Sequence, residues 1–222
     1  MDADRFATFD CYGTLIDWNG GIRSTLARLF GEDDADALLV RYHEIEPGVE
    51  AERYRTYREV LDLVTARLAD EEGRELTDGE RTMMSESLAD WPAFPEVPER
   101  LQELVDRGWS LVILSNCDRD LLAQSLPRLG APFERVIVAE DVRSYKPAHG
   151  HWEAFFAQTG APRDRYVHVA QSLFHDIAVA DELGLPSVWV NRLDETSPGP
   201  RPTREVSDLN ALPDVLDELV VP

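Results

Sequence analysis

The sequence has 222 residues, of which 43% are hydrophobic, enough for one large domain or for a core domain that carries a smaller insert. Its formal charge of -21 repels phosphate backbones and anionic lipid, so we expect neither nucleic acid nor a membrane as partner. No run approaches the roughly 18 apolar residues of a membrane span, and the acidic start of the chain does not resemble a signal peptide, so we expect a cytoplasmic protein.

The chain begins with an apolar strand that leads into a helical block. Residues 5–10 predict a short buried strand, and Tyr12-Gly13-Thr14 predicts a turn after it. Residues 20–90 show apolar side chains at helical spacing, with one long charged helix expected at about 48–69 and a capped helix start at Thr77. Three prolines between residues 91 and 98 then mark the end of this block.

Beyond residue 95, strands alternate with helices. Apolar runs predict strands at 110–115, 135–138, 166–170 and 187–190, with helices near 118–128, 149–159, 175–184 and 210–219 and a Pro-rich loop at Ser197–Pro202. Continuous apolar strands separated by helices indicate a parallel sheet covered on both faces. We therefore expect an α/β fold: a doubly wound, Rossmann-like core of residues 1–16 and 95–222, with an all-helical cap domain, residues 17–94, inserted after the first strand.

Polar residues follow four of these strands, at the edge of the sheet where ligands of such folds bind. They are Asp10, Ser115 with Asn116, Lys146, and the segment from Gln171 to Asp176. Lys146 is the only lysine among 22 basic residues. An ammonium and a guanidinium are not interchangeable in a tight site, so the single exception points to a catalytic position.

The motifs at these strand ends resemble those of the haloacid dehalogenase (HAD) superfamily. Phe9–Leu15 resembles the first motif, Leu114-Ser115-Asn116 the second, Tyr145-Lys146-Pro147 the third, and His168–Asp176, running on to Gly184, the fourth. They occur in the order and spacing of that family and cover essentially the whole chain. The resemblance implies that Asp10 is a covalent nucleophile.

The residue two positions after the nucleophile separates the reactions of this superfamily. Its phosphatases place a second Asp there to protonate the departing alkoxide, and they hold Mg²⁺ with a Gly-Asp pair after the fourth strand. This chain has Tyr12 and Ala170-Gln171 at those places. A phenol with a pKa of about 10 is a poor acid, whereas a halide leaves as a stable anion and needs no proton. The Asp-x-Tyr-Gly-Thr form is similar to that of L-2-haloacid dehalogenases.

This resemblance implies that Asp10 attacks the halogen-bearing carbon of a short 2-haloacid, and that water then hydrolyses the aspartyl ester without cofactor or metal. Lys146 is expected to keep Asp10 ionised, and Asp176 to orient or deprotonate the water. Thr14 and Ser115 complete the expected catalytic set as hydrogen-bond donors, and the expected substrate or halide contacts are Tyr12, Arg41, Asn116 and His175. For Arg41, which lies in the cap, a solvated charge on a helix face is the alternative.

Departures in the fourth motif leave other functions open. Gln171 and Leu173 stand where the family has Ser and Asn, and His175 replaces an aromatic residue. The alternatives are a Mg²⁺-dependent phosphatase acting on a small phosphomonoester and a HAD-scaffold protein of low activity. The expected partner is a small anionic substrate, and the resemblance also allows a homodimer.

Overall fold

The centre of the molecule is a six-stranded parallel sheet, seen in a computed structural model that describes residues 5–197 and 199–221. Its strand order is β3-β2-β1-β4-β5-β6. The strands are β1 (Arg5–Phe9), β2 (Trp109–Ser115), β3 (Arg135–Val138), β4 (Tyr166–Ala170), β5 (Ser187–Val190) and β6 (Arg204–Val206). Every residue of β1 and β4 is buried, as their continuous apolar sequences predict for central strands covered on both faces. The expected α/β class with a parallel, doubly wound sheet is confirmed.

The last strand, β6, is one that the sequence analysis did not anticipate. It pairs in parallel with β5 at the edge of the sheet and is three residues long. Its two charged residues, Arg204 and Glu205, are exposed, so it lacks the apolar run by which the other strands are recognised. Within the loop expected at Ser197–Pro202, residue 198 lies outside the described residues, as do residues 1–4 of the expected core and residue 222.

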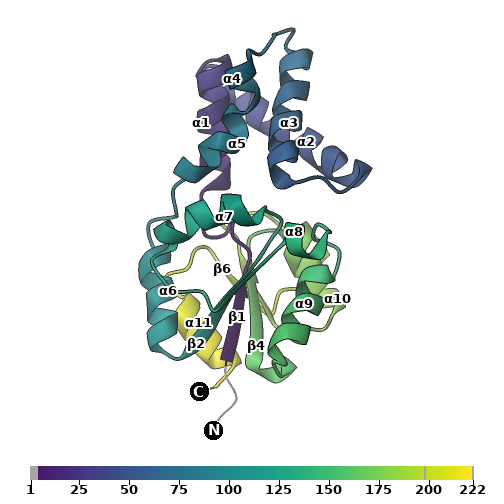
Figure 1. Ribbon diagram of the computed structural model, residues 1–222. Helices are drawn as coiled ribbons and strands as arrows, with labels where there is room; N and C mark the ends of the chain where they lie inside the picture. The colour runs from purple at the N-terminus through teal and green to yellow at the C-terminus, as the bar shows by residue number, and fades with distance from the viewer. Residues whose placement is uncertain (1–4, 198, 222) are drawn as a thin grey trace.

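Helices cover both faces of the sheet. Figure 1 shows α6 and α11 on one side and α8, α9 and α10 on the other. Their bounds are α6 (Val97–Asp106), α7 (Arg119–Ser125), α8 (Ala139–Val142), α9 (Gly150–Thr159), α10 (Ala178–Glu182) and α11 (Leu212–Leu219). Short turns of helix add η2 (Leu126–Leu129), η3 (Arg163–Arg165) and η4 (Leu173–Ile177), of which η4 is a π-helix. Such π-turns occur often at functional sites, and η4 carries part of the fourth motif.

Residues 18–90 form a helical insert that stands over one end of the sheet (Figure 1). It consists of α1 (Trp18–Phe30), α2 (Ala35–Glu52), α3 (Tyr57–Glu71), α4 (Asp78–Arg81), α5 (Met83–Ser87) and η1 (Leu88–Asp90). Apolar side chains from α1, α2 and α3 pack together and join the main core through residues such as Leu15 and Trp91. The insert and the sheet therefore share one continuous apolar interior.

The single long helix expected at about 48–69 is wrong. In the structure α2 ends at Glu52 and α3 begins at Tyr57. Thr56 caps α3, because its hydroxyl accepts a hydrogen bond from the backbone N–H of Glu59 while the Glu59 carboxylate accepts from the N–H of Thr56. This Thr-x-x-Glu capping box is visible in the sequence, but the helical periodicity on either side hid it. The expected start at Thr77 is confirmed, since α4 begins at Asp78.

No helix in the described part of the chain is long and apolar enough to cross a membrane.

Candidate active site

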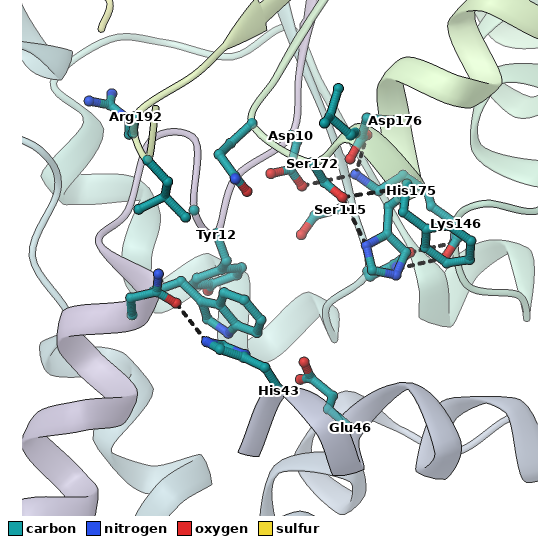
Figure 2. Close-up of a pocket in the computed structure, with 18 of the residues that line it drawn as sticks. Asp10, Tyr12, His43, Glu46, Ser115, Lys146, Ser172, His175, Asp176 and Arg192 are labelled. Carbon is teal, nitrogen blue, oxygen red and sulfur yellow. Dashed lines mark hydrogen bonds and ion pairs between the residues drawn. The ribbon is translucent and has the colours of Figure 1, made fainter. Parts of the chain in front are cut away.

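A cavity of about 680 Å³ lies between the carboxyl ends of the strands and the helical insert. Figure 2 shows Asp10 and Ser115 on its sheet side and His43 and Glu46 on α2 opposite. The cavity opens where the chain order of the sheet reverses, because β1 pairs with β2 on one side and with β4 on the other. Sheets of this kind bind ligands at that point.

Asp10 follows β1 directly and faces this cavity, with 11% of its side chain exposed. Its Oδ1 accepts a hydrogen bond from Lys146 Nζ at 2.9 Å, and its Oδ2 accepts one from Thr14 Oγ1 at 2.7 Å. Thr14 in turn accepts from the backbone N–H of Gln171, which ties the first motif to the fourth. Each oxygen of the nucleophile candidate is thus oriented by one donor and keeps further lone pairs for reaction.

Lys146 is almost completely buried, and its ammonium has three acceptors. Nζ donates to Asp10 Oδ1 at 2.9 Å, to Asp176 Oδ1 at 2.7 Å and to the carbonyl of Leu114 at 2.9 Å. Burial alone would lower the pKa of Lys146, but the two carboxylates outweigh it and raise that pKa. The lone lysine is therefore a buried cation whose ammonium lies between the carboxylates of Asp10 and Asp176.

Asn116 holds the backbone of Lys146 in place. Its Nδ2 donates to the carbonyl of Lys146 at 3.0 Å, and its Oδ1 accepts from the N–H of Lys146 at 2.6 Å. Both ends of the amide are engaged in this way, so Asn116 holds the lysine-bearing loop, and it also lines the cavity. The expected contact of Asn116 with halide or substrate stays a prediction, and its hydrogen bonds to the backbone of Lys146 were not anticipated.

Asp176, at the end of the fourth motif, is fully buried behind Lys146. Its Oδ1 accepts from Lys146 Nζ and, at 2.9 Å, from Nε2 of His168 on β4. Burial opposes ionisation of this carboxyl, but Lys146 and His168 together outweigh it and lower the pKa of Asp176. Its Oδ2 is buried and has no hydrogen-bond partner among the described residues.

Tyr12 and Ser115 line the cavity differently. The hydroxyl of Tyr12 lies 3.0 Å from Ser125 Oγ on α7, and its ring packs edge-on against Trp91. Burial raises the pKa of Tyr12 further, so its phenol is no proton donor for a leaving alkoxide. Ser115 Oγ makes no hydrogen bond with any described residue and is left to serve a ligand.

The wall opposite Asp10 is acidic. Glu46 and Glu50, one helical turn apart on α2, both line the cavity. Burial and the neighbouring Glu50 raise the pKa of Glu46, whose Oε1 accepts from Tyr57 Oη at 3.3 Å. Burial raises the pKa of Glu50 to about 7. Oε2 of Glu50 lies 3.9 Å from Nε2 of His175, which comes from the fourth motif on the core side.

Arg41 does not reach the cavity, so its expected halide-binding role is wrong. Its side chain is 46% exposed and forms ion pairs with Glu44 and Glu71 at 2.7 Å each. Because an α-helix turns by about 100° per residue, Arg41 lies on the side of α2 opposite to His43 and Glu50. The alternative, a solvated charge on a helix face, is the one that the structure supports.

Several cavity residues were missed, and most had a signal in the sequence. Arg192 follows β5 as Asp10 follows β1; its guanidinium lies 3.7 Å from the centre of the Phe94 ring and pairs with Glu96 at 2.7 Å. Glu46 and Glu50 share the apolar stripe of α2 with Tyr42 and Val49, an unusual place for carboxylates. Other missed residues that line the cavity include Asp17, Trp18, Asn19, His43 and Glu195.

The described residues that line the cavity carry no local excess of positive charge, although an anionic substrate would favour one. Lys146 and Arg192 are the cations among the lining residues, and both already pair with carboxylates. Six carboxyl groups line the same cavity: Asp10, Asp17, Glu46, Glu50, Asp176 and Glu195. The described residues contain no group of three or more His, Cys, Asp or Glu side chains that could hold a metal ion.

A family model for haloacid dehalogenase-like hydrolases matches residues 5–184, most of the chain and all four motifs. The chain belongs to the haloacid dehalogenase-like hydrolases. Within this family it is 25% identical to (S)-2-haloacid dehalogenase H-109 of Pseudomonas putida over 217 residues, which cover 94% of this chain and 96% of that protein. It is also 25% identical to an (S)-2-haloacid dehalogenase of Pseudomonas sp. (strain YL), covering 98% and 96% of the two chains.

Solved structures show the same fold. The crystal structure of an L-2-haloacid dehalogenase superposes with a TM-score of 0.86 at 24% identity and covers 97% of this chain and 99% of its own. The L-2-haloacid dehalogenase of Xanthobacter autotrophicus with chloropropionic acid covalently bound superposes with a TM-score of 0.84 at 19% identity, over 96% and 98% of the two chains. The HAD-like hydrolase fold thus covers 97% of the chain.

Proposed function

We propose that this haloacid dehalogenase-like hydrolase is a hydrolytic dehalogenase that converts short 2-haloacids to 2-hydroxyacids and halide. One observation carries the proposal: Asp10 faces the cavity, held by Lys146 and Thr14, and the residue two positions after it, where the phosphatases of this superfamily carry their acid, is Tyr12. Tyr12 occupies that place with its hydroxyl directed at Ser125. The (S)-2-haloacid specificity named for the relatives supports the same reaction.

The reaction has two steps. A carboxylate oxygen of Asp10 attacks the halogen-bearing carbon from the side opposite the halogen, so the carbon–halogen bond breaks and the halide leaves with the electron pair. Water then attacks Cγ of the aspartyl ester, which releases the 2-hydroxyacid and restores the carboxylate. Lys146 stabilises Asp10 between turnovers, and Thr14 orients it.

The substrate carboxylate has to be bound against the acidic wall of the cavity. The unpartnered hydroxyl of Ser115 supplies a donor beside Asp10. The raised pKa values of Glu46 and Glu50 keep part of that wall neutral below pH 7, so the wall repels an anion less than its carboxyl groups suggest. Donors and neutralised acids thus replace the arginine that the resemblance led us to expect.

Other assignments belong to the same proposal. The insert, within residues 17–94, acts as a cap domain over a core of residues 1–16 and 95–222. The enzyme needs no cofactor, works in the cytoplasm on a small anionic substrate, binds no nucleic acid, and forms a homodimer of the kind that the resemblance allows.

The test is halide release from (S)- and (R)-2-chloropropionate in the presence of EDTA, with phosphate release from p-nitrophenyl phosphate and Mg²⁺ measured in parallel. We expect EDTA-resistant chloride release that Asp10→Asn abolishes while the circular dichroism spectrum stays unchanged. After several turnovers in ¹⁸O-water, the label is expected in the Asp10 peptide, because water attacks the ester carbon of the enzyme.

Asp17→Asn is the matched control, since it removes another cavity-lining carboxylate that caps α1 at Gly20 and since Asn can still cap the helix. We expect it to keep turnover within about tenfold. Label found only in the hydroxyacid, or Mg²⁺-dependent phosphate release with no dehalogenation, would overturn the proposed function.

A further inference from the structure

Hydrolysis of the aspartyl ester needs a group that accepts a proton from water, and Asp176 is poorly suited to it. Its Oδ1 already accepts hydrogen bonds from Lys146 and His168, and these contacts lower its pKa. Its Oδ2 has no hydrogen-bond partner among the described residues, but this oxygen is buried away from solvent. A carboxylate stabilised in this way is a weak base, and its protonation would leave the ammonium of Lys146 without one of its two counter-charges. Another residue of the cavity is therefore better suited to accept the proton.

His175 has the position and the protonation state of a base. It lines the same cavity as Asp10, and Ser172 Oγ holds it by accepting from its backbone N–H at 3.0 Å and by lying 3.1 Å from its Nδ1. Figure 2 shows the ring beside Ser172 at the cavity. With Nδ1 occupied by Ser172, Nε2 is the nitrogen left for water. Burial lowers the pKa of His175, so its ring is neutral at pH 7.

The charges around His175 favour transient protonation. Glu50 Oε2 lies 3.9 Å from Nε2, on the opposite wall of the cavity. Asp176 and Asp10 raise the pKa of His175 and Lys146 lowers it, while the ring of Phe174 packs edge-on at 4.9 Å. The other cavity imidazole, His43, lies on α2 with its Nε2 3.0 Å from Asn19 Oδ1. Of these two imidazoles, His175 is the one whose Nε2 lies near a carboxylate across the cavity, which can stabilise the imidazolium.

We propose that His175 is the general base that deprotonates water for hydrolysis of the Asp10 ester, and that Glu50 is a positioning residue that stabilises the resulting imidazolium. The proposal rests on the dehalogenation proposed above and adds the group that completes its second step. It assigns a role to the histidine by which the fourth motif departs from the family pattern.

Hydrolysis of the Asp10 ester with His175 as base consists of water addition and collapse of the intermediate. Water oxygen bonds to Cγ of the ester while its proton passes to Nε2 of His175, giving a tetrahedral intermediate and an imidazolium beside Glu50. Collapse breaks the bond between Cγ and the alkoxide oxygen of the product. That oxygen takes the proton from Nε2, so the 2-hydroxyacid leaves neutral at its hydroxyl and the second proton of water remains on the restored Asp10 carboxyl until it passes to solvent.

The experiment is rapid quench with excess (S)-2-chloropropionate, measuring chloride and, by intact-protein mass, the fraction of enzyme trapped as ester. We expect His175→Gln to release one chloride per enzyme at the wild-type rate and then to accumulate ester, with hydrolysis slower by about 10²- to 10⁴-fold. His175→Asn is measured alongside, so that a folding defect in one variant leaves the other to decide; an intact chloride burst shows that the variant is folded.

The pH profile separates a base from a structural residue. Wild-type ester hydrolysis is expected to slow at acid pH as His175 becomes protonated, and this acid limb should be absent from His175→Gln and retained by Asp176→Asn. Glu50→Gln should instead slow ester hydrolysis above pH 7, where the Glu50 carboxylate is ionised and can stabilise the imidazolium. His149→Gln is the matched control: His149 lies 3.6 Å from Glu182 in an exposed pair away from the cavity, and its loss should change neither rate.

Two outcomes would overturn the inference. In the first, His175→Gln hydrolyses the ester at the wild-type rate with an unchanged acid limb, and Asp176→Asn accumulates the ester. This result would make Asp176 the base and leave the proposed dehalogenation intact. A wild-type enzyme that releases no chloride burst would reject the proposed function, and this inference with it.

Discussion

The lone lysine shows how much one side chain determines at this site. Lys146 is 1% exposed, and its three ammonium donors have three acceptors within 2.9 Å, two of them carboxylates. The geometry is that of a compact, tetrahedral cation, and these three contacts do not match the planar fork of a guanidinium. A chain that otherwise uses only arginine keeps a lysine here for a physical reason.

We therefore expect Lys146→Arg to lower chloride release by at least about 100-fold despite the retained charge, because the larger group displaces Asp10 from its attacking position. Steady-state halide release measures it. Arg41→Lys is the control, an equally conservative exchange at an exposed ion pair, and should stay within about twofold of wild type. Near-normal activity of Lys146→Arg would contradict this account of the lysine, and a large loss in Arg41→Lys would restore a halide role for Arg41.

At the scale of elements, α3 of the insert is capped from the core. The carboxylate of Asp118, which follows β2, accepts from the backbone N–H of Tyr57 at 2.8 Å and of Arg58 at 2.9 Å. These are two of the N–H groups that a helix start leaves unsatisfied, and a negative charge there also suits the helix dipole. One core side chain thus joins the two parts of the molecule that enclose the cavity.

Asp118→Ala should lower the free energy of unfolding by about 1–2 kcal/mol and speed hydrogen exchange at the amides of Tyr57 and Arg58. Urea denaturation and exchange measured by NMR or mass spectrometry test both. Asp120→Ala removes an exposed ion pair with Arg58, the second residue of α3. It should lower the free energy of unfolding by less than about 0.5 kcal/mol. Equal effects of the two substitutions would mean that Asp118 acts only as a surface charge.

At the scale of the whole molecule, the excess of acidic residues extends into the interior. The formal charge is -21, and buried Glu46 and partly buried Glu50 lie one turn apart on α2, where neither forms an ion pair with a lysine or arginine among the described residues. The pKa of Glu50 is raised from 4.5 to about 7, so between these pH values the folded protein binds a proton that the unfolded chain has released. Stability from this group is therefore present below about pH 4.5 and is lost as pH rises to 7.

Removing that group should flatten the pH dependence of stability. A rise from 4.5 to about 7 corresponds to about 3 kcal/mol, so Glu50→Gln should stabilise the protein by up to about that amount at pH 8 and by far less at pH 5. Urea midpoints at the two pH values measure it. Glu75→Gln, at an exposed position, should shift both midpoints alike; a Glu50→Gln effect that does not depend on pH would refute the buried-carboxylate explanation.

The sequence alone determined the features that depend on local pattern. Continuous apolar runs located five of the six strands, and the strand ends located Asp10, Ser115 and Lys146, because side chains at the carboxyl ends of parallel strands necessarily meet. The identity of Tyr12 already argued against a phosphatase. These inferences needed only the direction of the chain and the chemistry of each residue.

Only the tertiary structure decided which face of the insert meets the core. The helical period of α2 leaves its rotation open, so Arg41 was expected at the cavity, whereas packing against α1 and α3 turns Glu46 and Glu50 there. Packing also places the Asn116 side chain in hydrogen-bond contact with the backbone of Lys146. It brings Glu50 within 3.9 Å of His175, which is 125 positions away in the chain. Contacts between distant segments depend on the burial of whole surfaces, which no local pattern specifies.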